Sequence, residues 1–259
     1  MPGAGGRRRH HARTRAHDRH CRPARRVHRR RAGLARPHRA GVERARNQVC
    51  GFPALTEERR FVSRGGLKLQ AALDAFDLHP TGWRCADFGC STGGFTDCLL
   101  QARAAKVFAV DTGYGVLDWK LRNDPRVVVM ERTNALHTDP PPELVAAGLA
   151  HLVVVDLSWT RQQHALPACR RWLASDGLIV TLIKPHYEHD SGARARRGVL
   201  EDQVARDVVE GVCARICAMG FSVDGLVESP IRGGKGKSTG NREYLALVRV
   251  DPRAGASGN

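Results

Sequence analysis

Residues 84–111 read RCADFGCSTGGFTDCLLQARAAKVFAVD, and this stretch decides the fold. An apolar run ends at Asp87 and indicates a buried strand, and the next seven residues contain three glycines, which let the backbone turn tightly and pass close to a ligand. Apolar residues then recur at helical spacing, and a second apolar run ends at Asp111. This order of strand, glycine turn, helix, strand and acid predicts the nucleotide-binding half of a doubly wound α/β sheet, with a ligand over the carboxyl ends of the strands.

The glycine turn has the spacing D-x-G-x-x-x-G-G, which differs from the dinucleotide-binding pattern G-x-G-x-x-G. It suits a ligand that has no pyrophosphate, and S-adenosylmethionine fits this description. Gly89, Ser91 and Gly93 can pass close to its methionine portion, and Asp111 can accept hydrogen bonds from both ribose hydroxyls. The alternative is a glycine turn in an α/β protein of another function.

Apolar runs and amphipathic stretches alternate along the rest of the chain, which predicts a Rossmann-like, mostly parallel sheet with an antiparallel addition at one edge. A turn at 64–66 leads into a first helix that carries Lys68 in its first turn. Strands are expected at about 84–88, 106–110, 126–130, 151–156, 177–183, 221–227 and 243–250. Further helices are expected at about 95–104, 115–123, 142–147, 162–174 and 202–219, the last with Val204, Val208, Val212, Ile216 and Met219 on one face.

The net charge of +16 over 259 residues is distributed unevenly. Residues 1–60 hold 18 Arg, no Lys and four acidic residues, so they carry +14 and only +2 remains for 61–259. We predict a disordered extension at 1–60, a folded domain at 61–250 and a disordered tail at 251–259. The extension has two interpretations: a basic arm that contacts RNA phosphates, or a misplaced start or frame error in a GC-rich gene, which the absence of Lys favours.

Eight cysteines form no C-x-x-C pair and no spacing typical of zinc sites, so we expect free thiols in a reducing cytoplasm and no metal. Apolar runs are too short to cross a membrane, and the Arg-rich start lacks the apolar centre of a secretory signal. We therefore expect a cytoplasmic protein without a membrane partner. The oligomeric state stays open.

Lysine is rare in this arginine-rich chain, with six Lys among 42 basic residues. Because only Lys readily releases its proton, a Lys kept in such a composition points to a use for the ammonium group. Lys184 follows one apolar strand and Asp156 ends the preceding one, so both are expected at the ligand-binding edge. Taken singly, each is equally a strand-end charge that reaches water.

Six stretches, in this order, resemble the motifs of the TlyA group of FtsJ-like methyltransferases: RGGLKL (64–69), DFGCSTGGFTD (87–97), VDTGYG (110–115), ERTN (131–134), KPHYE (184–188) and GNREYL (240–245). The resemblance covers about residues 61–250. It implies an S-adenosylmethionine-dependent ribose 2′-O-methyltransferase whose partner is RNA, ribosomal RNA or ribosomal subunits being expected. It also implies a catalytic Lys-Asp-Lys-Glu tetrad at Lys68, Asp156, Lys184 and Glu243, with Lys184 facing the 2′-hydroxyl. The implied cofactor contacts are Asp87, Gly89, Ser91, Gly93, Gly94, Phe95, Asp111 and, near the adenine, Thr133 or Asn134.

The chain departs from this family pattern in three places. The usual Lys-Pro-Gln-Phe-Glu has His186 and Tyr187 in the middle, the loop at 232–239 is longer than usual, and residues 1–60 lack the apolar pattern of the family's N-terminal RNA-binding domain. Basic side chains at Arg64, Arg194, Arg196, Arg197, Arg232, Lys235 and Lys237 are the candidates for RNA phosphates. For the loops at 194–197 and 232–237, a solvated loop is the alternative.

Three other functions are considered. A methyltransferase for a small molecule or a protein is disfavoured by the Lys-Asp-Lys-Glu set. A nonenzymatic RNA-binding protein with a decayed methyltransferase fold is disfavoured by the intact glycine turn together with all four tetrad positions. A haemolysin-like protein would need a spanning or strongly amphipathic segment, and the sequence offers no support for one.

Overall fold

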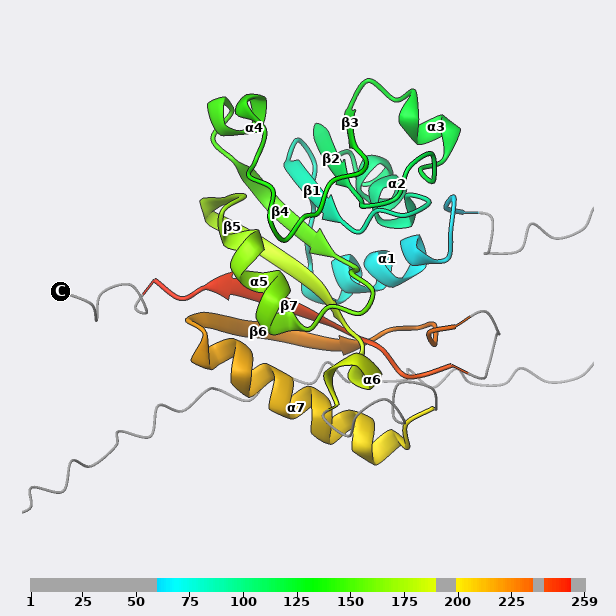
Figure 1. Cartoon of the computed structure of the whole chain (residues 1–259), viewed down its shortest axis with the longest axis vertical. Helices are drawn as coiled ribbons and strands as arrows, with labels where there is room; N and C mark the ends of the chain where they lie inside the picture. The colour runs from blue at the N-terminus through cyan, green and yellow to red at the C-terminus, as the bar shows by residue number, and fades with distance from the viewer. Residues whose placement is uncertain (1–59, 190–198, 235–239, 253–259) are drawn as a thin grey trace, which may run out of the picture.

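The computed structural model describes residues 60–189, 199–234 and 240–252 (Figure 1). The predicted RNA-contacting residues Arg194, Arg196, Arg197, Lys235 and Lys237 lie outside these ranges. The strands are β1 (Arg84–Phe88), β2 (Lys106–Val110), β3 (Val127–Met130), β4 (Ala150–Val155), β5 (Leu173–Ile183), β6 (Phe221–Glu228) and β7 (Tyr244–Val250). The helices are α1 (Gly65–Phe76), α2 (Gly94–Gln101), α3 (Trp119–Arg122), α4 (Pro142–Ala146), α5 (Gln162–Arg170), α6 (Pro185–Glu188) and α7 (Asp202–Ala218).

The strands form one sheet in the order β3-β2-β1-β4-β5-β7-β6. β1 to β5 are parallel, and β7 runs antiparallel to both β5 and β6. The predicted mostly parallel sheet with an antiparallel addition at one edge is therefore confirmed, with the reversed strand β7 one position in from the edge. The strand order reverses between β1 and β4, which opens a crevice at their carboxyl ends, the usual ligand-binding position in such sheets.

Helices cover both faces of the sheet (Figure 1), so each central strand is buried on both sides. Alternate residues of a strand point to opposite faces. In β1, Phe88 packs in the cluster that includes α4, α5 and α7, whereas Cys85 packs in the cluster that includes α1, α2 and α3. The apolar runs seen in the sequence are these doubly buried strands.

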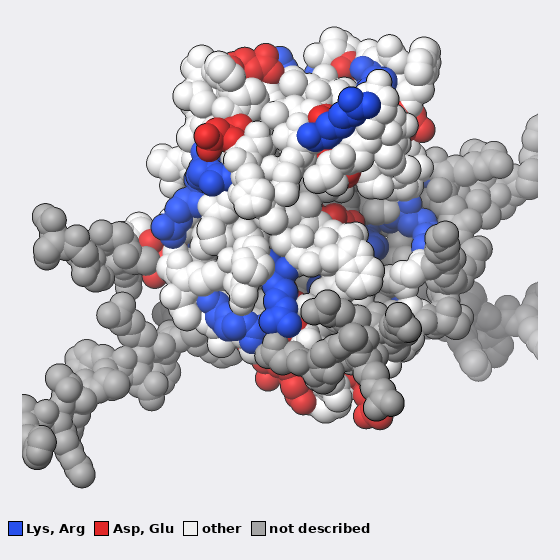
Figure 2. Space-filling view, viewed as in Figure 1, with Lys and Arg blue, Asp and Glu red and all other residues white. Residues whose placement is uncertain are grey.

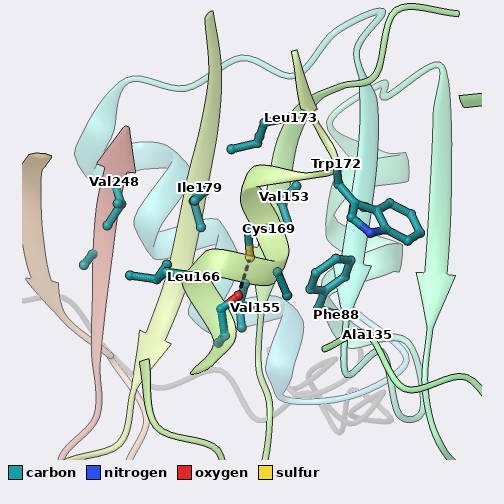
Figure 3. Close-up of a cluster of buried hydrophobic side chains, with 14 of the residues drawn as sticks. Phe88, Ala135, Val153, Val155, Leu166, Cys169, Trp172, Leu173, Ile179 and Val248 are labelled. Carbon is teal, nitrogen blue, oxygen red and sulfur yellow. Dashed lines mark hydrogen bonds between the residues drawn. The ribbon is translucent and has the colours of Figure 1, made fainter. Parts of the chain in front are cut away.

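The core beneath α5 is built around Trp172, which is fully buried (Figure 3). Its ring meets Phe88 edge-on at 5.1 Å between centroids, and its indole N–H donates to the carbonyl of Thr138 at 3.3 Å. Cys169 lies in the same cluster, and burial raises the pKa of its thiol far above the usual range. This free cysteine therefore acts as a small apolar side chain.

Several predicted boundaries are wrong. The expected turn at 64–66 overlaps α1, which starts at Gly65. The helix expected to 174 ends at Arg170, because the backbone of Ala150 pairs with residues 172 and 173 and draws Leu173 into β5. The helix expected at 115–123 is reduced to α3, since the Val116 N–H donates to Glu131 instead. The short helix α6 was not predicted.

The buried face of α7 also differs from the predicted one. Its buried residues are Ala205, Val209, Val212 and Ile216. Val204 and Val208 are only partly buried. Of the predicted residues, Val212 and Ile216 lie in the core and Val208 packs against it, but the prediction left out Val209, which is fully buried there.

Candidate active site

Two neighbouring parallel strands end in a lysine–carboxylate pair. Asp156 follows β4 and Lys184 follows β5, so the pairing of these strands places both side chains at the same edge of the sheet. Lys184 Nζ lies 2.6 Å from Asp156 Oδ1, and it also donates to the carbonyl of Leu157 at 3.5 Å. The Lys184 side chain is 12% exposed and that of Asp156 is 25% exposed. Lys184 is thus held by its partners but still accessible.

A second pair joins the start of the folded region to its end. Glu243 directly precedes β7, and because β7 is reversed its first residue, Tyr244, pairs with Ile183 at the end of β5. Lys68 extends from the first turn of α1 and places its Nζ 2.5 Å from Glu243 Oε2. The structure therefore groups the four predicted catalytic residues as two ion pairs.

Both pairs line one cavity of about 380 Å³ at the carboxyl ends of β1 and β4. Of the predicted cofactor residues, Gly89, Ser91, Gly94 and Phe95 line it, and of the predicted RNA-contacting residues, Arg64 and Arg232 line it. Other lining residues are Ser63, Gly65, Cys90, Thr92, Ser158, Tyr187, Ile231, Gly233 and Gly234. Residues of the glycine turn, α1, the strand ends and the loop after β6 thus meet in one cavity.

The glycine turn is held close to Asp156. Gly89 has φ +86°, and a Cβ atom there would lie 2.6 Å from the carbonyl oxygen of Asp156. The Ser91 N–H donates to Asp111 Oδ2 at 2.8 Å, and the Gly113 N–H donates to Asp111 Oδ1 at 2.7 Å. Asp111 therefore ties the glycine turn to the loop after β2, and each of its oxygens keeps a lone pair for a ligand hydroxyl.

The other predicted cofactor residues contact protein in the described structure. Asp87 is fully buried and accepts a 2.7 Å hydrogen bond from the Thr96 hydroxyl. A Cβ atom at Gly93 would lie 2.2 Å from the side chain of Leu121, so this glycine allows α3 to pack on the turn. The Thr133 hydroxyl donates to the carbonyl of Glu131, and Asn134 Oδ1 accepts from the N–H of Leu136. These four residues shape the surroundings of the cavity rather than line it.

An aromatic pair beside Lys184 was missed by sequence reasoning. The ring centroids of Trp159 and Tyr187 lie 4.7 Å apart, and Lys184 Nζ lies 5.7 Å from the Tyr187 ring. Trp159 is 68% exposed and has φ +59°, an uncommon backbone conformation for a bulky residue. The available signal was a tryptophan three residues after a strand end in a chain with few aromatic residues.

Comparisons with known proteins identify the family. Residues 61–248 match the sequence model described as FtsJ-like methyltransferase. The chain belongs to the FtsJ-like methyltransferase family. It is 39% identical over 240 residues to the 16S/23S rRNA (cytidine-2′-O)-methyltransferase TlyA of Mycobacterium tuberculosis, an alignment that covers 85% of this chain and 87% of the relative.

Other relatives of this FtsJ-like methyltransferase carry a different name. The Hemolysin A of Brachyspira hyodysenteriae is 38% identical over 188 residues, which cover 72% of this chain and 76% of the relative. The solved structure of a protein from Streptococcus thermophilus named a putative hemolysin superposes with a TM-score of 0.68 at 40% identity, and the match covers 76% of this chain and 70% of that one. Within the described ranges, we find no helix that is long and apolar enough to cross a membrane.

Burial and charge shift several pKa values in the FtsJ-like methyltransferase site. Burial, reinforced by the charges of Asp156 and Asp111, raises the pKa of Asp87 to about 7 despite the hydrogen bonds from Thr96. Burial, together with the charge of Lys184, lowers the pKa of His186 to about 4, so this residue is neutral at pH 7. In the residues placed by the structure, no group of three or more His, Cys, Asp or Glu side chains is arranged to hold a metal ion.

The charged surface around the FtsJ-like methyltransferase cavity is mixed. Figure 2 shows Lys and Arg side chains interspersed with Asp and Glu side chains over the face in view. At the cavity, Arg64 Nη2 donates to the carbonyl of Gly234 at 2.5 Å. Arg232 Nη2 lies 3.8 Å from Asp202 Oδ1. Binding of a polyanion at the cavity would therefore depend on individual side chains such as Arg64 and Arg232 rather than on a uniformly basic surface.

Proposed function

We propose that this FtsJ-like methyltransferase transfers a methyl group from S-adenosylmethionine to a ribose 2′-hydroxyl of RNA, with ribosomal RNA as the substrate class. The observation that carries the proposal is the presence of two lysine–carboxylate pairs in one cavity beside a glycine turn. The name of the M. tuberculosis relative, which specifies cytidine 2′-O-methylation of 16S and 23S rRNA, supports this reaction.

The residues of the cavity suit S-adenosylmethionine. Gly89, Ser91 and Gly94 of the turn line the cavity. Asp111 follows β2 just outside the lining, is joined to the turn by the Ser91 N–H, and would accept a ribose hydroxyl there. When bound, S-adenosylmethionine supplies an electrophilic methyl group on a sulfonium. The turn lacks the spacing that cradles a pyrophosphate, in agreement with a cofactor that has none.

Lys184 is the residue that would contact the 2′-hydroxyl. Its ammonium has three N–H donors, and Asp156 and the carbonyl of Leu157 accept two of them. The third is available to a hydroxyl oxygen in the cavity and would align an oxygen lone pair for in-line attack. The hydroxyl proton would pass to the Asp156 carboxylate, because the Lys184 ammonium has no lone pair to accept it.

The Trp159–Tyr187 pair favours RNA over a small molecule or a protein as the substrate. Nucleobases exposed by single-stranded RNA stack on aromatic rings, and each such contact contributes about 1–3 kcal/mol. An exposed indole that contacts a tyrosine ring at a tilt of 32°, next to Lys184, offers such a surface beside the proposed point of transfer.

The test is methyl transfer to purified ribosomal subunits, ribosomal RNA and unrelated protein substrates, with S-adenosylmethionine labelled in its methyl group. A 2′-O-methyl group blocks alkaline cleavage of the adjacent phosphodiester, so ribose methylation leaves the label in alkali-resistant dinucleotides. We expect labelled dinucleotides from the wild type and none from Lys184→Ala, with cofactor affinity unchanged in that variant. Asp111→Asn should instead weaken cofactor binding.

Lys106→Ala is the matched control. Lys106 pairs with Glu143 at 3.6 Å on the surface at the start of β2, at the opposite end of the strand from the cavity. This variant should methylate like the wild type. Label in bases, or in protein only, would contradict the proposal, and so would wild-type turnover by Lys184→Ala.

A further inference from the structure

A buried carboxylate, Glu188, joins two segments of the candidate site. Glu188 ends α6, is 4% exposed, and its Oε1 accepts the backbone N–H of Gln162 at 2.7 Å. Gln162 is the first residue of α5, where a carboxylate both accepts an unpaired N–H and is favoured by the helix dipole. The other carboxylate oxygen of Glu188, Oε2, lies 3.6 Å from Nη2 of Arg215 in α7. Burial raises the pKa of Glu188, while the Gln162 N–H and the Arg215 charge oppose that shift.

The Gln162 side chain continues this contact into the sheet. It is 4% exposed, it accepts from the Thr181 hydroxyl at 2.6 Å, and its Nε2 donates to the carbonyl of Leu182 at 3.2 Å. Thr181 and Leu182 lie at the end of β5, directly before Lys184. The start of α5 is thus fixed to the strand that carries the lysine.

The Lys184–Asp156 pair is one of several contacts between the same two chain segments. Residues 156–162 begin at Asp156 and end at Gln162, and residues 184–188 begin at Lys184 and end at Glu188. The two segments are joined at one end by the Lys184–Asp156 ion pair and at the other by the Glu188–Gln162 hydrogen bond. The Trp159–Tyr187 ring contact joins them in the middle.

We infer that Glu188 is a positioning residue, which acts through Gln162 to hold the segments of Asp156 and Lys184 in register. This inference rests on the function proposed above. Without the Glu188 carboxylate, Gln162 keeps its side-chain hydrogen bonds to β5, but the Gln162 end of the segment at 156–162 loses its direct link to the segment at 184–188. The Lys184 ammonium and the aromatic pair then lose their common geometry. A displacement of about 1 Å in a reacting group can cost about 10²-fold in rate.

The experiment compares Glu188→Ala with Glu188→Gln in the full chain. Glu188→Ala should lower kcat for RNA methylation about 10²-fold, with cofactor affinity unchanged, because the Glu188 carboxylate contacts Gln162 and Arg215 rather than α1 or the glycine turn. Glu188→Gln keeps an acceptor for the Gln162 N–H and should restore kcat to within about fivefold of the wild type. Gln162→Ala should also lower kcat, whereas Gln163→Ala, its exposed neighbour, should not.

Hydrogen exchange supplies a readout that does not depend on activity. In Glu188→Ala, the amides at 157–162 should exchange faster while those of α1 keep their wild-type rates. Unchanged exchange at 157–162, or unchanged kcat, would overturn the inference. A loss of exchange protection throughout the protein, accompanied by losses of cofactor binding and kcat, would also overturn it, because it would indicate general destabilisation. A wild type that labels no RNA, with local exchange changed as expected, would instead refute the proposed function and leave the positioning contact intact.

Discussion

Asp87 combines complete burial with a carboxylate oxygen, Oδ1, that has no hydrogen-bond partner in the described structure. Its ordinary pKa of 3.8 is raised to about 7 by burial and by two neighbouring carboxylates. Between pH 3.8 and about pH 7, Asp87 is protonated in the folded protein but ionised in the unfolded chain. The contribution of Asp87 therefore makes the protein less stable as the pH rises from about 4 to about 7, and the cost is fully present above that range.

We expect Asp87→Asn to remove this pH dependence. The amide oxygen can still accept from the Thr96 hydroxyl, and the variant has no charge to bury. Thermal unfolding of both proteins at pH 5 and pH 8 measures the effect, and the wild type should lose more of its Tm between the two than the variant does. Equal losses would mean that Asp87 ionises as easily in the folded protein as in the unfolded chain.

The Lys68–Glu243 pair should behave as a coupled unit. The side chains are 13% and 4% exposed, so removing one partner leaves the other charge buried and unpaired, at a cost of about 3–5 kcal/mol. We expect Lys68→Met to be strongly destabilised, and the Lys68→Met, Glu243→Gln double variant to recover a large part of the loss. Urea unfolding of the wild type, Lys68→Met, Glu243→Gln and the double variant gives the coupling energy, and strictly additive losses would contradict the pairing.

The turn between β1 and α2 is constrained by backbone contact. Gly89→Ala would combine φ +86° with a Cβ atom 2.6 Å from a carbonyl oxygen of the neighbouring chain segment. Gly82 has φ +76° and open space around it, so Gly82→Ala carries the conformational cost alone. We expect Gly89→Ala to be less stable than Gly82→Ala by about 1–3 kcal/mol, and only Gly89→Ala to lose cofactor affinity.

Chemical unfolding and cofactor titration of these two glycine variants check the prediction. Similar stability in both would mean that left-handed φ, rather than the approach of the Asp156 carbonyl, is what requires glycine in this turn. Comparison of the two variants thus distinguishes a requirement of the Gly89 backbone conformation from close packing between the ends of β1 and β4.

Element types were easier to predict than element ends. The 3.6-residue period located α1 and α7, and the apolar runs located the strands, because both patterns record burial along a local stretch. The end of α5 was missed because it is decided by pairing with Ala150 in another strand. The four residues of α6 are too few for a period to show.

At the scale of the whole molecule, residues 1–60 carry +14 of the net charge of +16. If this segment contacts RNA phosphates, the affinity of the full chain for ribosomal RNA should fall more steeply with salt than that of a chain beginning at Phe61. The slope of log K against log salt should change by about 0.7 for each additional phosphate contact with single-stranded RNA.

Binding titrations over a range of salt concentrations test this point, with methyl transfer measured on the same two proteins. Equal slopes and equal turnover would support the interpretation that the arginines reflect base composition. A steeper slope for the full chain would support the basic arm. The same measurements test the predicted domain boundary near residue 60, which requires the chain beginning at Phe61 to be folded and active.

The family and the residue types of the candidate site could be read from the sequence without a structure. The order of strand, glycine turn, helix, strand and acid is local, and the six motifs lie in continuous stretches that can be recognised without knowledge of the fold. Lys68, Asp156, Lys184 and Glu243 were identified in this way. Their pairing was not, because the motifs indicate the four residues without showing which lysine contacts which acid.

Only the tertiary structure decided which lysine pairs with which acid. Asp156 pairs with Lys184 because β4 and β5 are adjacent and parallel, whereas Glu243 reaches Lys68 because β7 is reversed and starts where β5 ends. The contact of Glu188 with the start of α5 has the same origin. Hydrophobic periodicity records which residues are buried, but strand order and register, which depend on the packing of the whole chain, decide which distant residues meet.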